Sequence, residues 1–193
     1  MINDVTALRG DPEMAGVVAR AGVPVILMHM KGAPQTMQRA PRYRDVVAEV
    51  TTFLAEAMQT ARAAGIAREQ LWLDPGLGFG KTVAHNLQLL QHLDELAALG
   101  RPLVIGPSRK SFIGRLLDAE PDERLAGTLA CVGYGAARGA QMVRVHDVKP
   151  VVQFLTIWSM IRHLSPHLSA RRRRASLRNS HRSALRAERQ VGG

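Results

Sequence analysis

The stretch Leu71–Lys81, LWLDPGLGFGK, decides the fold. It begins with a short apolar run, continues with Asp74 and Pro75, and then places three glycines before a lysine. Apolar residues return at helical spacing from Val83 onward. This order predicts a buried strand whose carboxyl end opens into a glycine-rich loop and then into a helix.

Asp74 stands where the predicted strand leaves the core, so two roles are open for its carboxylate. It is held by rigid backbone and exposed enough to bind, and the glycines after it let the loop approach a flat ligand closely. It is also placed to cap the helix that follows. A phosphate cradle is disfavoured, because GLGFGKT has neither the Walker A spacing nor the glycine order of a dinucleotide fingerprint. Taken alone, the loop leaves ligand contact and helix cap equally open.

The rest of the chain alternates between strand-like and helix-like segments. Val23–Met30 (VPVILMHM) is a continuous apolar run of strand length, which is typical of strands buried on both faces. Asp11-Pro12-Glu13 is a helix start, and Gly22 ends that helix. On similar grounds we expect strands at 2–5, 71–74, 103–106 and 141–146, and helices at 45–64, 83–99, 111 onward, 123–139 and 148–164.

Polar side chains follow each of the five predicted strands. Strands separated by helices form parallel βαβ units, whose carboxyl ends meet at one edge where ligands bind. Arg144 and His146 stand two residues apart on one predicted strand, so both are expected to point to the same face. A buried arginine is costly unless it meets an anion. The pattern predicts a polar, anionic substrate held by groups at Asn3 and Asp4, His29, Asp74, 108–111 and 144–147.

Other chemistry-bearing residues have plainer interpretations. Lys110 and Ser111 precede a helix whose free N–H groups favour a carboxylate or a phosphate. Cys131 lies within a predicted helix and is interpreted as a core residue rather than a nucleophile. No cluster has zinc-ligand spacing. The remaining histidines are interpreted as surface or packing residues: His85, His92, His163, His167 and His181.

Length and composition indicate a globular protein of one domain or slightly more. The 193 residues are 46% hydrophobic, and no apolar run approaches the roughly 20 residues of a membrane span. The N-terminus has neither the basic start nor the apolar stretch of a secretion signal. The single cysteine excludes an intramolecular disulfide, so a cytoplasmic location is expected.

The net charge of +10 is concentrated at the C-terminus. Residues 165–193 hold eight arginines and one glutamate, so this segment carries +7. Its few apolar residues predict a disordered tail that follows a folded domain of residues 1–164. A solvated extension is favoured over specific nucleic-acid binding, although a block of like charge also binds polyanions weakly and nonspecifically.

Five short motifs stand out along the chain: INDV (2–5), LMHM (27–30), DPGLGFGK (74–81), SRKSFIGRLL (108–117) and RVHDV (144–148). In this order and at these separations, Ile2–Leu164 closely resembles the dihydropteroate synthase family. SRKS after one strand and RVHDV on another separate it from the related pterin-binding methyltransferases. The resemblance implies a (β/α)8 barrel that joins 4-aminobenzoate to 6-hydroxymethyl-7,8-dihydropterin diphosphate and releases pyrophosphate. It also implies Mg²⁺ as cofactor and sulfonamides as inhibitors.

The resemblance assigns the pterin to one group of residues. Asn3, Asp74 and Lys110 would hold the ring, and Asp74 would hydrogen-bond its amino-pyrimidine edge. Met28 would line the same pocket. This implied role corresponds to the ligand-contact interpretation of Asp74.

A second group of residues is implied for the diphosphate and the aminobenzoate. Arg144 and His146, with the backbone of Val145, would bind the diphosphate. Ser111 would receive the aminobenzoate carboxylate, while Phe79 and Lys110 flank its ring. A leaving pyrophosphate needs cations where charge develops, whereas the arylamine needs only positioning. The expected catalytic residues are therefore the cations of the site, Lys110, Arg144 and His146.

The chain departs from the family on its N-terminal side. In the family, three further βα units precede INDV and supply a magnesium-binding asparagine, a flexible loop and another pterin-binding aspartate. Met1 stands where the fourth strand is already under way, so we expect a truncated chain with about five βα units, two open sheet edges and no metal ligand of its own. The alternative functions are a non-catalytic pterin or diphosphate binder and a basic-tailed nucleic-acid-associated protein.

The last predicted helix, Val148–Leu164, indicates a homodimer. Its apolar residues cover most of the helix circumference, which is more than one buried face requires. The family is similar in dimerising through its late helices. The alternative is a core helix sandwiched against the preceding one.

Overall fold

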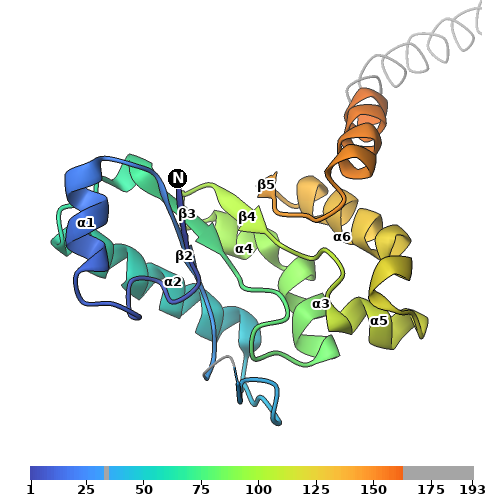
Figure 1. Ribbon diagram of the computed structural model, residues 1–193, viewed down its shortest axis with the longest axis horizontal. Coiled ribbons are helices and arrows are strands. Elements are labelled where there is room, and N and C mark those ends of the chain that lie inside the picture. Colours follow the sequence, from blue (N-terminus) through green and yellow to red (C-terminus); the bar gives the residue numbers. More distant parts are fainter. Residues whose placement is uncertain (33–34, 163–193) are drawn as a thin grey trace, which may run out of the picture. The chain divides into compact units, whose positions relative to one another are not determined.

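Five parallel strands form a sheet whose spatial order follows the chain, β1-β2-β3-β4-β5 (Figure 1). The structure is a computed structural model that describes residues 1–32 and 35–162. Between β2 and β3 the register pairs Val25 with Leu71 and Met28 with Asp74. The strands are β1 (Ile2–Asp4), β2 (Val25–Met28), β3 (Leu71–Asp74), β4 (Leu103–Ile105) and β5 (Ala140–Val143). All five predicted strands are thus confirmed; β3 has the predicted bounds, and the other four are shorter than predicted.

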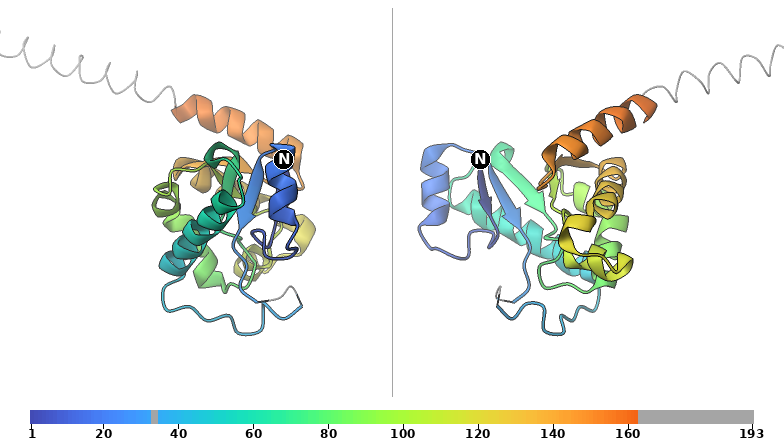
Figure 2. Two further views of the ribbon diagram at one scale, coloured as in Figure 1. Left: turned by 90° about the vertical axis from the view of Figure 1, so that its left-hand side faces the viewer. Right: turned by 45° about the vertical axis from the view of Figure 1, so that its right-hand side comes forward.

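Helices connect successive strands, as parallel pairing requires. Figures 1 and 2 show α1 and α2 beside the β1–β2 end of the sheet, and α5 and α6 at the other end. A further helical segment runs from 148 to 162. The labelled helices are α1 (Met14–Ala21), α2 (Val46–Ala63), α3 (Val83–Gln91), α4 (Leu93–Ala97), α5 (Ser111–Leu117) and α6 (Leu125–Ala137), with 3-10 turns at Arg68–Gln70 and Pro121–Glu123.

The chain divides into two compact units, Met1–Val151 and Val152–Gly193. The first unit contains the whole five-stranded sheet and all of its connecting helices. The predicted basic tail, 165–193, lies outside the described residues, as do His163, His167 and His181. Within the part of the chain that the structure describes, no helix combines the length and apolarity needed to cross a membrane.

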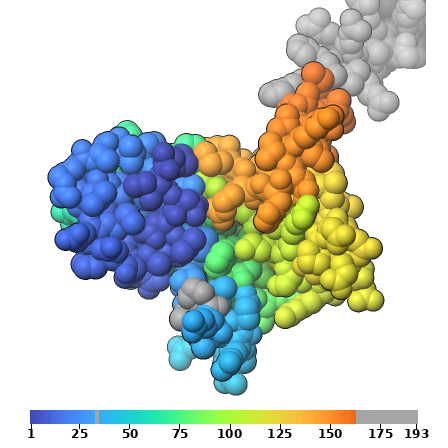
Figure 3. Space-filling model, in the orientation of Figure 1, coloured from blue at the N-terminus to red at the C-terminus, as the bar shows by residue number. Residues whose placement is uncertain are grey.

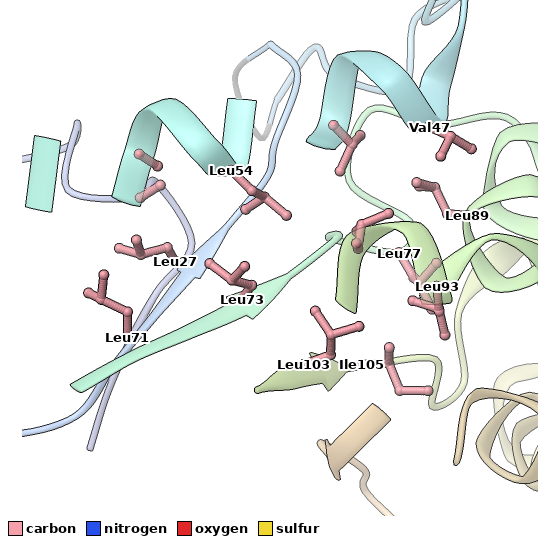
Figure 4. Packing of buried hydrophobic residues seen from close by; sticks show 14 of the residues in the cluster. Leu27, Val47, Leu54, Leu71, Leu73, Leu77, Leu89, Leu93, Leu103 and Ile105 are labelled. Carbon is pink, nitrogen blue, oxygen red and sulfur yellow. The ribbon is translucent and has the colours of Figure 1, made fainter. Parts of the chain in front are cut away.

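The hydrophobic core lies between one face of the sheet and the helices (Figure 4). Leu27, Leu73 and Ile105 of three neighbouring strands pack in the same cluster as Leu54 of α2 and Leu93 of α4, and all five side chains are fully buried. Burying one such side chain stabilises the fold by about 1.5–3 kcal/mol. This layer therefore holds the strand ends in place.

The opposite face of the sheet carries the polar residues. Side chains alternate between the two faces along a strand, so Asn3, Met28 and Asp74 lie on the face turned away from the α2–α4 layer. Asp74 is fully buried and Asn3 is exposed. The face that the sequence predicted for ligand binding is thus separate from the apolar layer that stabilises the sheet.

Two helix predictions need correction. The helix predicted from Asp11 begins only at Met14, because the Asp11 carboxylate accepts a hydrogen bond from Glu13 N and closes a turn instead. The helix predicted at 83–99 is divided at His92, whose backbone leaves the helical region (φ −114°, ψ 30°). Leucines on both sides of this break remain buried, so the apolar periodicity continues through it and suggests one helix.

The fifth strand also differs from its prediction. β5 ends at Val143, so Arg144 and His146 lie in the loop after it rather than on one strand. The β4–β5 register shifts between Leu103 and Val104, where the Gln141 side chain accepts a hydrogen bond from Leu103 N at 2.8 Å. A side chain has replaced a backbone partner there, which the apolar pattern cannot reveal. The predicted strand, 141–146, is therefore too long at its carboxyl end.

Candidate functional site at the carboxyl edge of the sheet

A cavity of about 250 Å³ opens at the carboxyl ends of the strands. In Figure 3 the hollow lies between the blue N-terminal segment and the yellow-green segment near residue 110. One of two larger surface hollows of about 490 Å³ contains His29, but neither contains any of the nine residues that the resemblance assigns to substrate binding. The cavity is lined by Asn3, Val5, Phe79, Gly106, Ser108, Lys110, Arg144, Val145 and His146. Six of the nine residues predicted to bind substrate are in that set.

Asp74 is the most deeply buried charged group of the site, with no exposed surface. Its Oδ1 accepts a hydrogen bond from Gly76 N at 2.7 Å, and its Oδ2 accepts one from Arg144 Nη2 at 2.9 Å. Burial raises the pKa of Asp74, while the positive charge of Arg144 and the Gly76 N–H oppose that rise. The helix-cap interpretation is wrong, because Thr82 caps α3 by accepting a hydrogen bond from His85 N.

Arg144 joins three strands across the cavity. While Nη2 donates to Asp74, Nη1 donates to Asn3 Oδ1 at 2.8 Å. A Cβ on Gly106 would lie 2.6 Å from Arg144 Nη2, so only glycine leaves room for the guanidinium there. The arginine implied for the diphosphate therefore contacts two residues implied for the pterin.

Phe79 and Lys110 meet at the mouth of the cavity. Lys110 Nζ lies 4.0 Å from the centroid of the Phe79 ring, which is a cation–π contact. Burial and the charge of Arg144 lower the pKa of Lys110. A Cβ on Gly78 would come within 2.9 Å of Lys110 Cδ, so this glycine makes room for the lysine chain. The two residues implied to flank the aminobenzoate ring contact each other here.

His146 is held by Ser108, which is almost fully buried. Ser108 Oγ lies 3.1 Å from His146 N, whose N–H it accepts, and 3.0 Å from His146 Nδ1. Next to this pair, Arg109 makes two hydrogen bonds to the Asp147 carboxylate, at 2.7 and 3.0 Å. These contacts connect the loop after β4 to the loop after β5. Sequence reasoning placed Ser108 at the rim but missed that it orients His146.

Three of the nine predicted binding residues do not line the cavity. One is Asp74, whose partner Arg144 does line it, and the other two are Met28 and Ser111. Met28 is fully buried beside Asp74, its partner in the β2–β3 register. Ser111 is exposed as the first residue of α5 and follows Lys110, which makes no side-chain cap. The roles implied for these two residues remain predictions.

Sequence reasoning missed Lys81 altogether. Its ammonium is buried, donates to Gly76 O and Phe79 O at 3.0 Å each, and lies 2.9 Å from His29 Nδ1. Burial lowers the pKa of Lys81 to about 7, while burial and the lysine charge lower the pKa of His29 to about 3. Lys81 therefore clamps the glycine-rich loop to the end of β2. The partner His29 lies 52 residues away, so the local pattern gives no signal for this role.

The remaining candidate groups have structural roles. Cys131 packs against the core, and burial raises its pKa to about 11, so it stays a thiol. His85 shares the α3 capping box with Thr82. Within residues 1–32 and 35–162, no three His, Cys, Asp or Glu side chains come together to hold a metal ion.

Parallel βα units with a polar, cationic cavity at their carboxyl ends define a ligand-binding (β/α) barrel domain. The family model for pterin binding enzymes matches residues 1–146. The chain belongs to this family. Dihydropteroate synthase from Escherichia coli K12 is 48% identical to it over 157 residues, which are 81% of this chain and 55% of that protein. The Synechocystis enzyme is 46% identical over 158 residues, with the same coverage of both chains.

Solved structures agree with the sequence comparison. Yersinia pestis dihydropteroate synthase in complex with a sulfonamide drug has a TM-score of 0.81 and 44% identity, covering 84% of this chain and 58% of that one. The Xanthomonas albilineans enzyme with 4-aminobenzoic acid has a TM-score of 0.78 and 49% identity, covering 84% and 57%. The predicted fold class, five βα units of a (β/α)8 barrel, is confirmed. The chain spans about 55% of the length of the curated relatives named above.

Proposed function

We propose that this chain carries the substrate site of a dihydropteroate synthase, which condenses 6-hydroxymethyl-7,8-dihydropterin diphosphate with 4-aminobenzoate. One observation carries the proposal: Arg144 donates hydrogen bonds to both the fully buried Asp74 and Asn3. The cavity beside this pairing is lined by Asn3, Arg144, Lys110 and His146. Relatives solved with 4-aminobenzoic acid and with 7,8-dihydropteroate support these ligands.

The pterin half of the proposal rests on Asp74. Two carboxylate oxygens match a pair of N–H donors on an amino-pyrimidine edge, a bidentate arrangement that charge strengthens. The carboxylate is already oriented, because Gly76 N holds Oδ1 and the core anchors β3. Lys110 and Asn3 then complete the ring pocket from two other strands.

The diphosphate half of the proposal rests on the cations around the same cavity. In the reaction, the C–O bond to the diphosphate breaks, a C–N bond to the arylamine forms and the amine loses a proton. Negative charge develops on the leaving pyrophosphate, so Lys110, Arg144 and His146 stabilise it where it forms. Phe79, Ser111 and Met28 are proposed only to position the two rings.

Magnesium belongs to the proposal only through the family resemblance. When bound, the ion would neutralise charge on the diphosphate oxygens. The described residues bring no cluster of metal-ligating side chains to the cavity. We therefore assign it no ligand and no step in this chain.

Pyrophosphate release by the purified chain tests catalysis, and calorimetry with the pterin diphosphate tests binding. We expect release that requires both substrates and falls when a sulfonamide competes with 4-aminobenzoate. Lys110→Met should lower the rate at least about tenfold, because it removes one cation near the leaving group. Binding without release would favour the non-catalytic pterin binder, and the absence of both would contradict the proposal.

We also propose a homodimer formed through the helical segment 148–162. Val152, Ile157 and Met160 expose 55%, 60% and 56% of their surface, which is unusual for three apolar residues on one short segment. Ile157→Glu should convert a dimer to a monomer in sedimentation velocity at micromolar concentration. Gln153→Glu, at an exposed polar position of the same segment, is the control and should leave the dimer intact. A monomeric wild-type protein would contradict the proposal.

A further inference from the structure

This inference rests on the proposed function. Arg144 forms an ion pair with Asp74, the same carboxylate that the proposed function assigns to the pterin. An unpaired carboxylate in a fully buried position is costly, and Arg144 supplies its partner while no substrate is bound. The side chain of Arg144 is still 39% exposed. The arginine therefore lies at the border between the buried carboxylate and the open cavity.

A pterin ring has to approach the same two acceptors that Arg144 uses. The guanidinium spans from Asn3 Oδ1 to Asp74 Oδ2, with hydrogen bonds of 2.8 and 2.9 Å. Gly106 provides the space in which it lies. Ring N–H groups that bind Asp74 and Asn3 therefore compete directly with the arginine for its place.

We propose that Arg144 is an exchangeable partner that makes the site specific for a pterin carrying a diphosphate. In the empty site Arg144 neutralises Asp74. When substrate enters, the diphosphate takes the guanidinium and the ring donors take Asp74, so both charged groups exchange one partner for another. A pterin without the diphosphate breaks the same ion pair and leaves the arginine without an anion. Such a pterin binds more weakly, because it has to displace the ion pair with Asp74 and gives the guanidinium no anion in return.

Two neighbouring cations make the exchange feasible. Lys81 also exerts its charge on Asp74, so the carboxylate keeps a cation nearby after the guanidinium leaves. Lys110 and Arg144 line the same cavity, and burial together with the charge of Arg144 lowers the pKa of Lys110. An anion that enters between them relieves the repulsion of the two positive charges. The site thus favours exchange when a diphosphate arrives and favours the ion pair when none is present.

The experiment uses calorimetry of the full chain with 6-hydroxymethylpterin, inorganic pyrophosphate and both together. In the wild-type protein, saturating pyrophosphate should strengthen binding of the uncharged pterin by about tenfold or more, and the pterin should strengthen pyrophosphate binding equally, because coupling is reciprocal. In Arg144→Met this coupling should fall below about twofold. The variant should also bind the pterin alone at least as tightly as the wild type does.

Two further variants keep the result interpretable. Arg144→Lys retains the charge but cannot bridge Asn3 and Asp74 at once, so it should retain only part of the coupling. Arg138→Met removes one positive charge from an arginine that pairs with Asp94, and it should leave the coupling unchanged. Circular dichroism and thermal melting confirm that each variant is folded.

The possible outcomes separate this inference from the proposed function. If the wild-type protein binds the uncharged pterin but pyrophosphate changes its affinity less than twofold, the exchange is overturned while the pterin site stands. The same holds if Arg144→Met loses affinity for the uncharged pterin along with the diphosphate. If the wild type binds neither the uncharged pterin nor the pterin diphosphate, both the exchange and the proposed function fail.

Discussion

Asp74→Asn should abolish pterin binding, with a loss in affinity of about 100-fold or more. The amide keeps the shape of the side chain but replaces one acceptor oxygen with an NH₂ donor. That donor faces a ring edge that also presents N–H groups, so a buried polar pair is left unsatisfied. Calorimetry with a pterin ligand measures the effect, and an unchanged affinity would remove Asp74 from the proposed site.

The same substitution should make the free energy of unfolding of the empty protein less dependent on pH. Burial raises the pKa of Asp74 above its usual 3.8, so the folded state binds this proton more tightly than the unfolded state does. A raised carboxyl pKa contributes stability at low pH, and that contribution is lost as the pH rises from 3.8 through the folded-state pKa. The charges of Arg144 and Lys81 reduce this loss without cancelling it.

Urea unfolding at a series of pH values measures this stability effect. The free energy of unfolding of the wild type should fall relative to that of Asp74→Asn as the pH rises, because the asparagine has no charge to bury. If the free energy of unfolding changes with pH in the same way for the two proteins, burying the ionised Asp74 does not lower the stability. A flatter pH dependence of stability together with a loss of binding is the expected result for a carboxylate that is buried for a ligand.

Gly76→Ala should destabilise the protein more than an ordinary glycine substitution in the same backbone conformation. Gly76 has φ +67°, and a Cβ there would lie 1.9 Å from His29 O, a backbone atom that cannot move without disturbing the end of β2. We expect a loss of about 3 kcal/mol or more in the free energy of unfolding, since strain and a backbone clash act together. The loop that presents Gly76 N to Asp74 should shift as well.

Gly22→Ala is the matched control for this prediction. Gly22 ends α1 with φ +61°, yet a Cβ there would meet nothing within 4 Å. Its substitution should cost only the left-handed strain, about 1–2 kcal/mol. Urea unfolding measures the loss in the free energy of unfolding for both variants. The difference between the two losses is the cost of the clash with His29. Equal losses would mean that the glycine-rich loop moves freely away from His29, and that it is not the rigid support on which the site depends.

Much of the site could be predicted because it depends on local chemistry. The run LWLD followed by glycines specifies a strand end, and Gly76, Gly78 and Gly80 all have the positive φ that the loop requires. Parallel βα units then bring their carboxyl ends to one edge whatever their side chains are. Asn3, Asp74 and Arg144 could therefore be expected near one another before any contact was known.

Other features resisted prediction because their causes lie far away in the chain. The clamp by Lys81 depends on His29, just after β2, and the register shift of β5 depends on the Gln141 side chain, which accepts a hydrogen bond from Leu103 of β4. An apolar pattern reports which residues are buried. It does not report which buried polar or charged groups pair with each other.

The sequence alone thus determined the order of strands and helices, the conformation of the glycine-rich loop and the edge at which the polar residues gather. Only the tertiary structure decided how those polar residues pair. Asp74 and Arg144 are 70 residues apart, and Arg144 and Asn3 are 141 apart. Their pairing follows from the burial of a carboxylate that needs a cation and from the space that Gly106 leaves for it. Burial and space at one point both arise from the packing of several elements, so neither can be read from local sequence.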